Sequence, residues 1–132
     1  MKFFSVEGAM QLIPQLEGDI QRLRELQGNI LRKKIEMDIL RMTGGVSDST
    51  AYAPSQNLGR GVKEMNHWVL EFNSIIGKMN GLGCQLKDPE AGLVDFFHIR
   101  DDKIVNLCWK FGEDKIQFWH ELEGGFATRE NL

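Results

Sequence analysis

Three histidines and two cysteines are the residues of this chain with the most versatile chemistry. His67, His98, His120, Cys84 and Cys108 offer imidazole and thiolate groups, and acidic residues are abundant. These group types are the usual protein ligands of zinc. However, no two of the five have the spacing that places two ligands on one helix face, and there is no Cys-x-x-Cys pair. The spacing therefore predicts no metal site, and no cofactor is expected.

Cysteine catalysis is a second candidate chemistry, centred on Cys108. A reactive thiolate needs a neighbouring base or cation that lowers the pKa of the thiol. Lys110 is the cation that the sequence offers nearby, so an inert, half-buried thiol is the preferred interpretation. The run Trp119-His120-Glu121 suggests a triad, but adjacent strand residues point to opposite faces of a sheet. No catalytic residue is predicted.

The elements that must position these residues begin with a long antiparallel helical hairpin. Ser5 is a suitable N-cap, and apolar residues then recur every three to five positions from Leu12 to Met42. Pro14 predicts a kink or a restarted helix. Residues 43–57 are rich in Gly, Ser, Thr and Asp and predict a flexible loop. A second amphipathic helix is expected over about Leu58–Asn80, which completes a hairpin over about 5–80.

Beyond Gly83 the pattern changes to that of strands, which predicts a three- to four-stranded antiparallel β-meander over about 83–123. The expected strands are Cys84–Lys87, Gly92–Arg100, Lys103–Phe111 and Ile116–Leu122. Residues 124–132 are expected to form an extended C-terminal arm that docks through Phe126. The predicted fold class is therefore α+β, in a single domain that covers residues 1–132.

Tight turns between the last three strands would fix the register of this sheet. In the first turn Arg100 would face Lys103, and in the second Gly112 would face Lys115. The second turn would then place His120 opposite Leu107. Because side chains alternate between faces, a register determines which residues share a surface.

The predicted register gives the sheet two faces. The more apolar face, expected to pack on the helices, carries Val94, Phe96, His98, Val105, Leu107, Trp109, Phe118, His120 and Leu122. On it, His98 and His120 are roughly 10 Å apart, too far to share a metal ion. The other face places Cys108 between Asp95 and Trp119. It also exposes Phe97 and Ile99 among other apolar residues, and such a surface usually marks an interface.

A small-molecule site at the junction between sheet and helices is the alternative use of the more apolar face. Aromatic walls with a few polar groups are typical of ligand pockets. The candidate ligand-binding residues are Asp95, His98, Trp109, His120 and Arg129. The same residues would also suit a core with polar edges, so the functional and the structural interpretation both stay open.

The composition is that of an ordinary globular chain, with 42% hydrophobic and 27% charged residues. A net charge of −3 argues against nucleic acid as a partner. No apolar run approaches the roughly 20 residues needed to span a bilayer, and the first ten residues do not resemble a secretory signal. A cytoplasmic location with free thiols at Cys84 and Cys108 is therefore predicted.

The two ends of the chain read FFSVEGAMQLIPQL and KDPEAGLVDFFHIRDDKIVNLCWKFGEDKIQFWHELEGGFATRE. Together with the charged helices between them, they resemble a family of small bacterial and archaeal proteins catalogued as the domain of unknown function 2203 family. Members tend to have Gly-Leu-Val-Asp-Phe-Pro where this chain has GLVDFF, so Phe97 replaces a proline. The resemblance implies a single prokaryotic intracellular domain without an assigned activity, cofactor or site. Within the resemblance, the polar and aromatic positions to mutate first are Asp95, Trp109, His120 and Arg129.

Two functions from different classes are therefore expected. The first is a non-enzymatic interaction module that serves a larger protein partner. It would form a homodimer through the helical hairpin, in coiled-coil fashion, or through the sheet face that carries Asp95, Phe97, Ile99 and Cys108. The alternative is a small-molecule-binding protein or hydrolase-like enzyme with a site at the sheet–helix junction around His120. Neither nucleic acid nor a membrane is an expected partner.

Overall fold

The computed structural model describes residues 1–43 and 53–132. The chain divides into two compact units: the first contains Met1–Leu23 and Ile75–Leu132, and the second contains Arg24–Ser74. Long helices precede an antiparallel sheet in sequence, which confirms the predicted α+β class. Over the part of the chain that the structure describes, neither long helix has the apolar length that crossing a lipid bilayer requires.

Helices α1 (Val6–Met10), α2 (Ile13–Thr43) and α3 (Ala53–Gly81) follow the predicted pattern closely. The Ser5 hydroxyl accepts a hydrogen bond from the Gly8 N–H at 3.0 Å, which confirms the N-cap. The chain leaves the helical conformation just before Pro14 and restarts as α2, as the proline predicted. The predicted loop 43–57 is shorter than expected, because α3 already begins at Ala53; its remainder, 44–52, lies outside the described residues.

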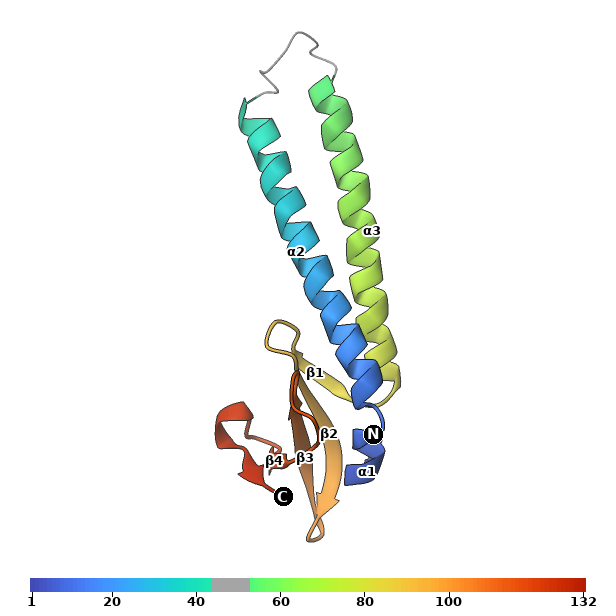
Figure 1. Ribbon diagram of the computed structural model, residues 1–132, viewed down its shortest axis with the longest axis vertical. Helices are drawn as coiled ribbons and strands as arrows, with labels where there is room; N and C mark the ends of the chain where they lie inside the picture. Colours follow the sequence, from blue (N-terminus) through green and yellow to red (C-terminus); the bar gives the residue numbers. More distant parts are fainter. Residues whose placement is uncertain (44–52) are drawn as a thin grey trace. The chain divides into compact units, whose positions relative to one another are not determined.

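The strands form one antiparallel sheet in sequence order (Figure 1). They are β1 (Gln85–Asp88), β2 (Leu93–Arg100), β3 (Lys103–Lys110), β4 (Phe118–Glu121) and β5 (Glu130–Asn131). The sheet therefore has five strands, one more than the upper end of the predicted three to four. The extra strand is β5, where the C-terminal arm returns to pair with β4.

The β2–β3 hairpin has the predicted register, with Arg100 paired to Lys103 and His98 to Val105. Its turn residues Asp101 and Asp102 have φ angles of 51° and 62°. Two consecutive left-handed residues match the twist of the flanking strands, and aspartate tolerates that conformation better than most residues.

The predicted register between the third and fourth strands is wrong by one residue. Leu107 pairs with Trp119, and His120 pairs with Asn106 instead of Leu107. The connection is a longer loop, 111–117, in place of a tight turn. Glu113 holds this loop, because its carboxylate accepts a hydrogen bond from the Lys110 N–H at 2.7 Å. A shift of one residue turns every side chain of a strand to the opposite face, so β4 presents Phe118 and His120 on the face where Trp119 and Glu121 were expected.

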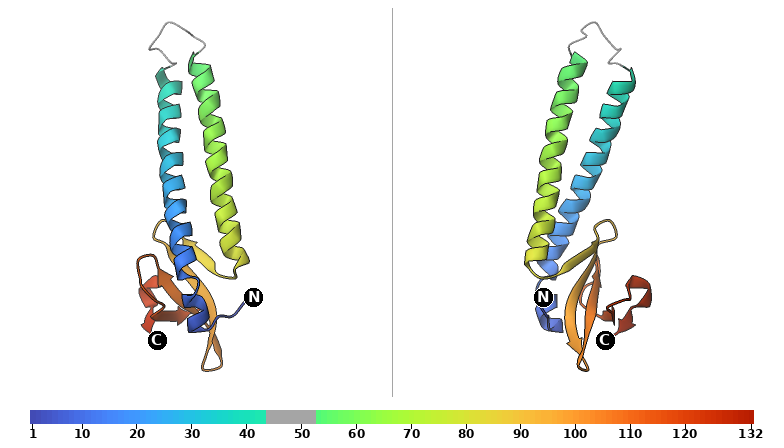
Figure 2. Two further views of the ribbon diagram at one scale, coloured as in Figure 1. Left: turned by 45° about the vertical axis from the view of Figure 1, so that its right-hand side comes forward. Right: turned by 180° about the vertical axis from the view of Figure 1, so that it is seen from behind.

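The corrected register defines an inner and an outer face of the sheet. The inner face carries Val94, Phe96, Val105, Leu107 and Trp109, all at most 1% exposed. Phe96 meets Phe4 edge-on at 5.2 Å between ring centroids, so the inner face packs against the N-terminal segment. The outer face carries Asp95, Phe97, Asn106, Cys108 and His120. Figure 2 shows the sheet between α1 on one side and the C-terminal arm on the other.

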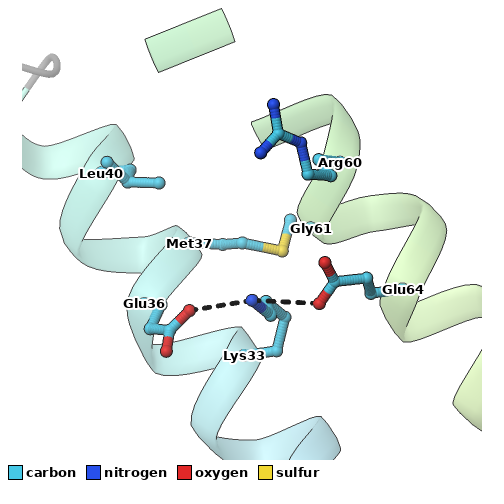
Figure 3. Close-up of a pocket in the computed structure, with 7 residues that line it drawn as sticks. All are labelled: Lys33, Glu36, Met37, Leu40, Arg60, Gly61 and Glu64. Atoms are coloured by element: carbon cyan, nitrogen blue, oxygen red, sulfur yellow. Dashed lines mark hydrogen bonds and ion pairs between the residues drawn. The ribbon is translucent and has the colours of Figure 1, made fainter. Parts of the chain in front are cut away.

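In the second unit α2 and α3 run antiparallel. They contact each other at a glycine of α3 and through an ion pair. A Cβ added to Gly61 would lie 3.1 Å from the Met37 side chain, so the glycine lets the helices approach closely. Lys33 Nζ contacts Glu36 at 3.0 Å and Glu64 at 3.2 Å. Those two carboxylates, Glu36 foremost, raise the pKa of Lys33. Figure 3 shows these side chains around a polar pocket of about 260 Å³.

The buried thiol of Cys84 should make stability depend on pH. Burial, chiefly, raises its pKa from 9.0 to about 11, so the native state disfavours the thiolate. The contribution is fully present below pH 9, where the thiol is protonated in the folded and unfolded chains. It is lost as the pH rises towards 11, by about 2 kcal/mol.

We expect the free energy of unfolding of Cys84→Ser to fall less steeply than that of the wild type over this range, because a serine hydroxyl does not ionise there. Urea titrations at pH 8, 9, 10 and 10.5 measure the difference. The prediction would be contradicted if the free energies of unfolding of the two proteins fell equally as the pH rises. The ionisation of Cys108 does not affect this comparison, because both proteins contain Cys108.

Candidate functional site

Three buried side chains of different chemistry meet on the outer face of the sheet. Asp95, Cys108 and His120 come from the neighbouring strands β2, β3 and β4. They are 3%, 2% and 2% exposed, and one ligand-type atom of each lies within 4.8 Å of the other two. The sheet pairing produces this meeting, because Asp95 is directly opposite Cys108, and His120 is opposite Asn106, two residues along β3.

The orientation of His120 is set by two hydrogen-bond partners. Its Nδ1 lies 2.7 Å from the Glu121 carbonyl oxygen, which only accepts, so Nδ1 carries a proton. Its Nε2 lies 3.2 Å from Asp95 Oδ2. In the neutral imidazole Nε2 is then an acceptor that faces a carboxylate oxygen. Two acceptors at this distance repel each other unless a proton or a metal cation lies between them.

The thiol of Cys108 is protonated in this surrounding. Burial, as the largest cause, and the charge of Asp95 raise its pKa to about 12, although the neighbouring Arg129 acts in the opposite direction. Such a thiol is a poor nucleophile at neutral pH. Cys108 is therefore not activated as a nucleophile, unless a bound cation stabilises its thiolate.

Arg129 fixes the C-terminal arm beside this cluster. Its guanidinium carbon lies 4.1 Å from the ring centroids of both Phe118 and Phe126. Its Nη1 donates to both carboxylate oxygens of Glu113, at 3.0 and 2.9 Å. Phe126 itself remains 42% exposed, so the arm is anchored by Arg129 and by β5 more than by the predicted Phe126.

A pocket of about 270 Å³ opens over the cluster. Its lining residues come from the sheet and from the start of the arm: Lys87, Asp88, Leu93, Asp95, Cys108, His120, Gly124, Gly125 and Phe126. Gly124 lies against the cluster, since a Cβ added there would be 3.5 Å from His120 Cβ. The arm thus forms one wall of the pocket.

Asn106 adds an unsatisfied polar atom to the same face. It is 4% exposed, and its Oδ1 has no hydrogen-bond partner among residues 1–43 and 53–132. An unpaired buried acceptor usually indicates a bound water, ion or ligand nearby. Its position directly opposite His120 in the sheet places that acceptor next to the cluster.

The structure brings together only some of the residues predicted as a site. Asp95, His120 and Arg129 gather around Cys108. His98 and Trp109 lie on the inner face: His98 Nδ1 donates to the Phe4 carbonyl oxygen at 2.7 Å, and Trp109 Nε1 donates to the Glu113 carbonyl oxygen at 2.9 Å.

The candidate site therefore lies on the outer face, away from the predicted sheet–helix junction. Cys108, Asn106 and Glu113 are the residues that sequence reasoning left out of it. The position of Cys108 beside Asp95 could have been predicted from the sequence, because the two residues pair in the correctly predicted first hairpin.

Arg129→Lys should loosen the arm while keeping its charge. A lysine cannot stack its charged group flat between Phe118 and Phe126, and we expect a loss of about 1–2 kcal/mol from the two ring contacts. Limited proteolysis with mass spectrometry should then show faster cleavage within 124–132. Arg41→Lys, at a half-exposed ion pair with Asp38, is the matched control. Equal cleavage of the two variants would contradict the anchoring role.

The fold and the cluster together define the class: an α+β protein with a buried Asp–Cys–His cluster beside a pocket. A family model described as an uncharacterized conserved protein (DUF2203) matches residues 2–132. The chain belongs to this family, which confirms the resemblance seen in its sequence. No curated protein and no solved structure matches the chain.

Proposed function

We propose that the protein is a ligand-binding domain and that its site is the pocket over Asp95, Cys108 and His120. The supporting observation is the convergence of three buried polar side chains from three strands beneath a pocket of about 270 Å³. Buried polar groups reduce stability unless they are paired, and here the Nε2–Oδ2 hydrogen bond is long, at 3.2 Å. A polar occupant of the pocket, which Asp95 and His120 both line, would give these two side chains a further partner.

Native mass spectrometry of the freshly purified chain, prepared without chelator, tests this proposal. We expect a reproducible added mass on the wild type that is absent from His120→Ala and retained by His67→Ala, whose imidazole is exposed on α3. A wild-type spectrum with only the mass of the polypeptide, after preparation from cells and after incubation with cell metabolites and metal salts, would overturn it.

Self-association is a second candidate function, which a different observation favours. Leu31, Ile35, Ile39 and Met42 are 59%, 50%, 54% and 85% exposed. Their spacing of three and four residues places them on one face of α2, on the far side from the buried Met37. An apolar row of this kind usually serves an interface. The proposed partner is a second copy of this chain, bound through this row in a coiled-coil arrangement.

Light scattering after size-exclusion chromatography tests the self-association. We expect a dimer at micromolar concentration for the wild type and a monomer for the double variant Ile35→Lys/Ile39→Lys. Ile99→Lys, at a position on the outer sheet face that is 54% exposed, should remain dimeric. The reverse result would move the interface to the sheet, and a monomeric wild type would exclude the dimer.

A cytoplasmic location is part of the same proposal. Cys84 and Cys108 are free, buried thiols. Proteins of oxidising compartments tend to use their cysteines in disulfides, whereas the cytosol keeps thiols reduced. The thiol at the pocket would thus remain available to a ligand.

A further inference from the structure

Asp95, Cys108 and His120 have the chemical types and the mutual distances of a metal-binding set. We infer that they bind a divalent transition metal ion of the zinc class, with three protein ligands and a fourth position directed to the pocket. This inference names the ligand class of the pocket and so rests on the proposed binding function. Zinc lies about 2.0–2.3 Å from nitrogen, oxygen and sulfur ligands. The observed separations, all within 4.8 Å, need only small side-chain movements to reach that geometry.

The hydrogen bond of His120 Nδ1 supports the metal in particular. Histidines that bind a metal almost always donate their other ring N–H to a carbonyl or carboxylate oxygen, which fixes the tautomer and the ring orientation. Here Nδ1 donates to the Glu121 carbonyl at 2.7 Å. The lone pair of Nε2 is thereby directed to the side where Asp95 Oδ2 lies, 3.2 Å away.

The charges of the set also match a divalent cation. A carboxylate and a thiolate together carry two negative charges, and the imidazole is neutral in this tautomer. Arg129 does not replace the cation, because its own charge is paired with Glu113 at 2.9 Å. A bound dication would remove the repulsion between Nε2 and Oδ2 and would be balanced by the two anionic ligands.

The donor types select the kind of metal. Thiolate and imidazole ligands favour zinc and its transition-metal neighbours, whereas magnesium and calcium prefer oxygen ligands throughout. A site with three protein ligands keeps a position for water or another small ligand. The pocket of about 270 Å³, which all three proposed ligands line, has room for such a ligand.

Titration of the purified, chelator-treated chain with Co²⁺ tests the inference, because cobalt substitutes for zinc and has a visible spectrum. We expect one ion per chain, a sulfur-to-cobalt charge-transfer band, and intense d–d bands typical of tetrahedral coordination. Cys108→Ser should lose the charge-transfer band, and Cys84→Ser should keep it. His120→Ala and Asp95→Asn should each weaken binding by more than the roughly 10–100-fold that the loss of an outer-shell partner costs, and His67→Ala should not.

Zinc X-ray absorption on the wild type provides a measurement that does not depend on the folding of variants. One sulfur at about 2.3 Å together with nitrogen or oxygen neighbours at about 2.0–2.2 Å is the expected shell. A shell without sulfur, or cobalt bands that survive Cys108→Ser, would overturn the inference. If Co²⁺ and Zn²⁺ fail to bind while the added mass that depends on His120 persists, the metal is excluded and the ligand-binding function stands. If both are missing, both proposals fail.

Discussion

Trp109→Ala is expected to lower the free energy of unfolding by about 3–5 kcal/mol, the usual range for removing a large aromatic side chain from a core. Trp109 is 0% exposed on the inner face and meets the Phe111 ring at 6.5 Å. Its Nε1 also donates to the Glu113 carbonyl at 2.9 Å. The substitution therefore creates a cavity and releases the loop that sets the position of β4.

Urea unfolding followed by circular dichroism measures this effect. Leu70→Ala is the control, because that side chain is 69% exposed and its loss should change stability by no more than about 0.5 kcal/mol. A change below about 1.5 kcal/mol in Trp109→Ala would show that the inner face is not the main core.

His120→Ala should lower the free energy of unfolding by about 3 kcal/mol. In the metal-free chain a proton between Nε2 and Oδ2 makes their 3.2 Å contact attractive, and its loss leaves Asp95 as a buried charge with little compensation. Asp95 is 3% exposed, and without the imidazole it keeps the weak S–H donor of Cys108. The measurement belongs in chelator at pH 7, so that a bound metal contributes nothing to the difference.

The double variant His120→Ala/Asp95→Asn identifies the cause of that loss. If the orphaned carboxylate is responsible, the neutral amide should recover part of the stability, and the two changes should not be additive. His67→Ala is the matched histidine control and should be neutral. A double variant that is less stable than His120→Ala would mean that the loss comes from the cavity, not from the charge.

The helices and the first hairpin were predictable because local patterns determine them. The apolar repeat of α2, the restart at Pro14 and the pairing of β2 with β3 each depend on residues close in sequence. The fifth strand was missed, since Glu130-Asn131 has no strand preference of its own. It pairs through its backbone, in an arm that Arg129 also holds against Phe118.

The candidate site could not be predicted in full because it depends on one loop. Gly112-Glu113-Asp114 reads as a tight turn, yet Glu113 binds both the Lys110 N–H and Arg129. The contact with Arg129 joins residues 16 positions apart, which a local pattern does not reveal. The predicted register placed His120 on the same face as His98. The observed register, shifted by one residue, places His120 beside Asp95 and Cys108. A one-residue error in register was enough to separate the ligands of the proposed metal.

The order of the strands also bears on how the protein matures during synthesis. Because β1 to β5 pair in sequence order, each strand pairs with the strand made just before it, and short-range pairing of this kind favours rapid folding. The arm that walls the pocket is translated after β4. Asp95, Cys108 and His120 all precede the arm in the sequence, so the pairing of β2, β3 and β4 is sufficient to bring them together, and the arm closes the pocket without supplying any of the three.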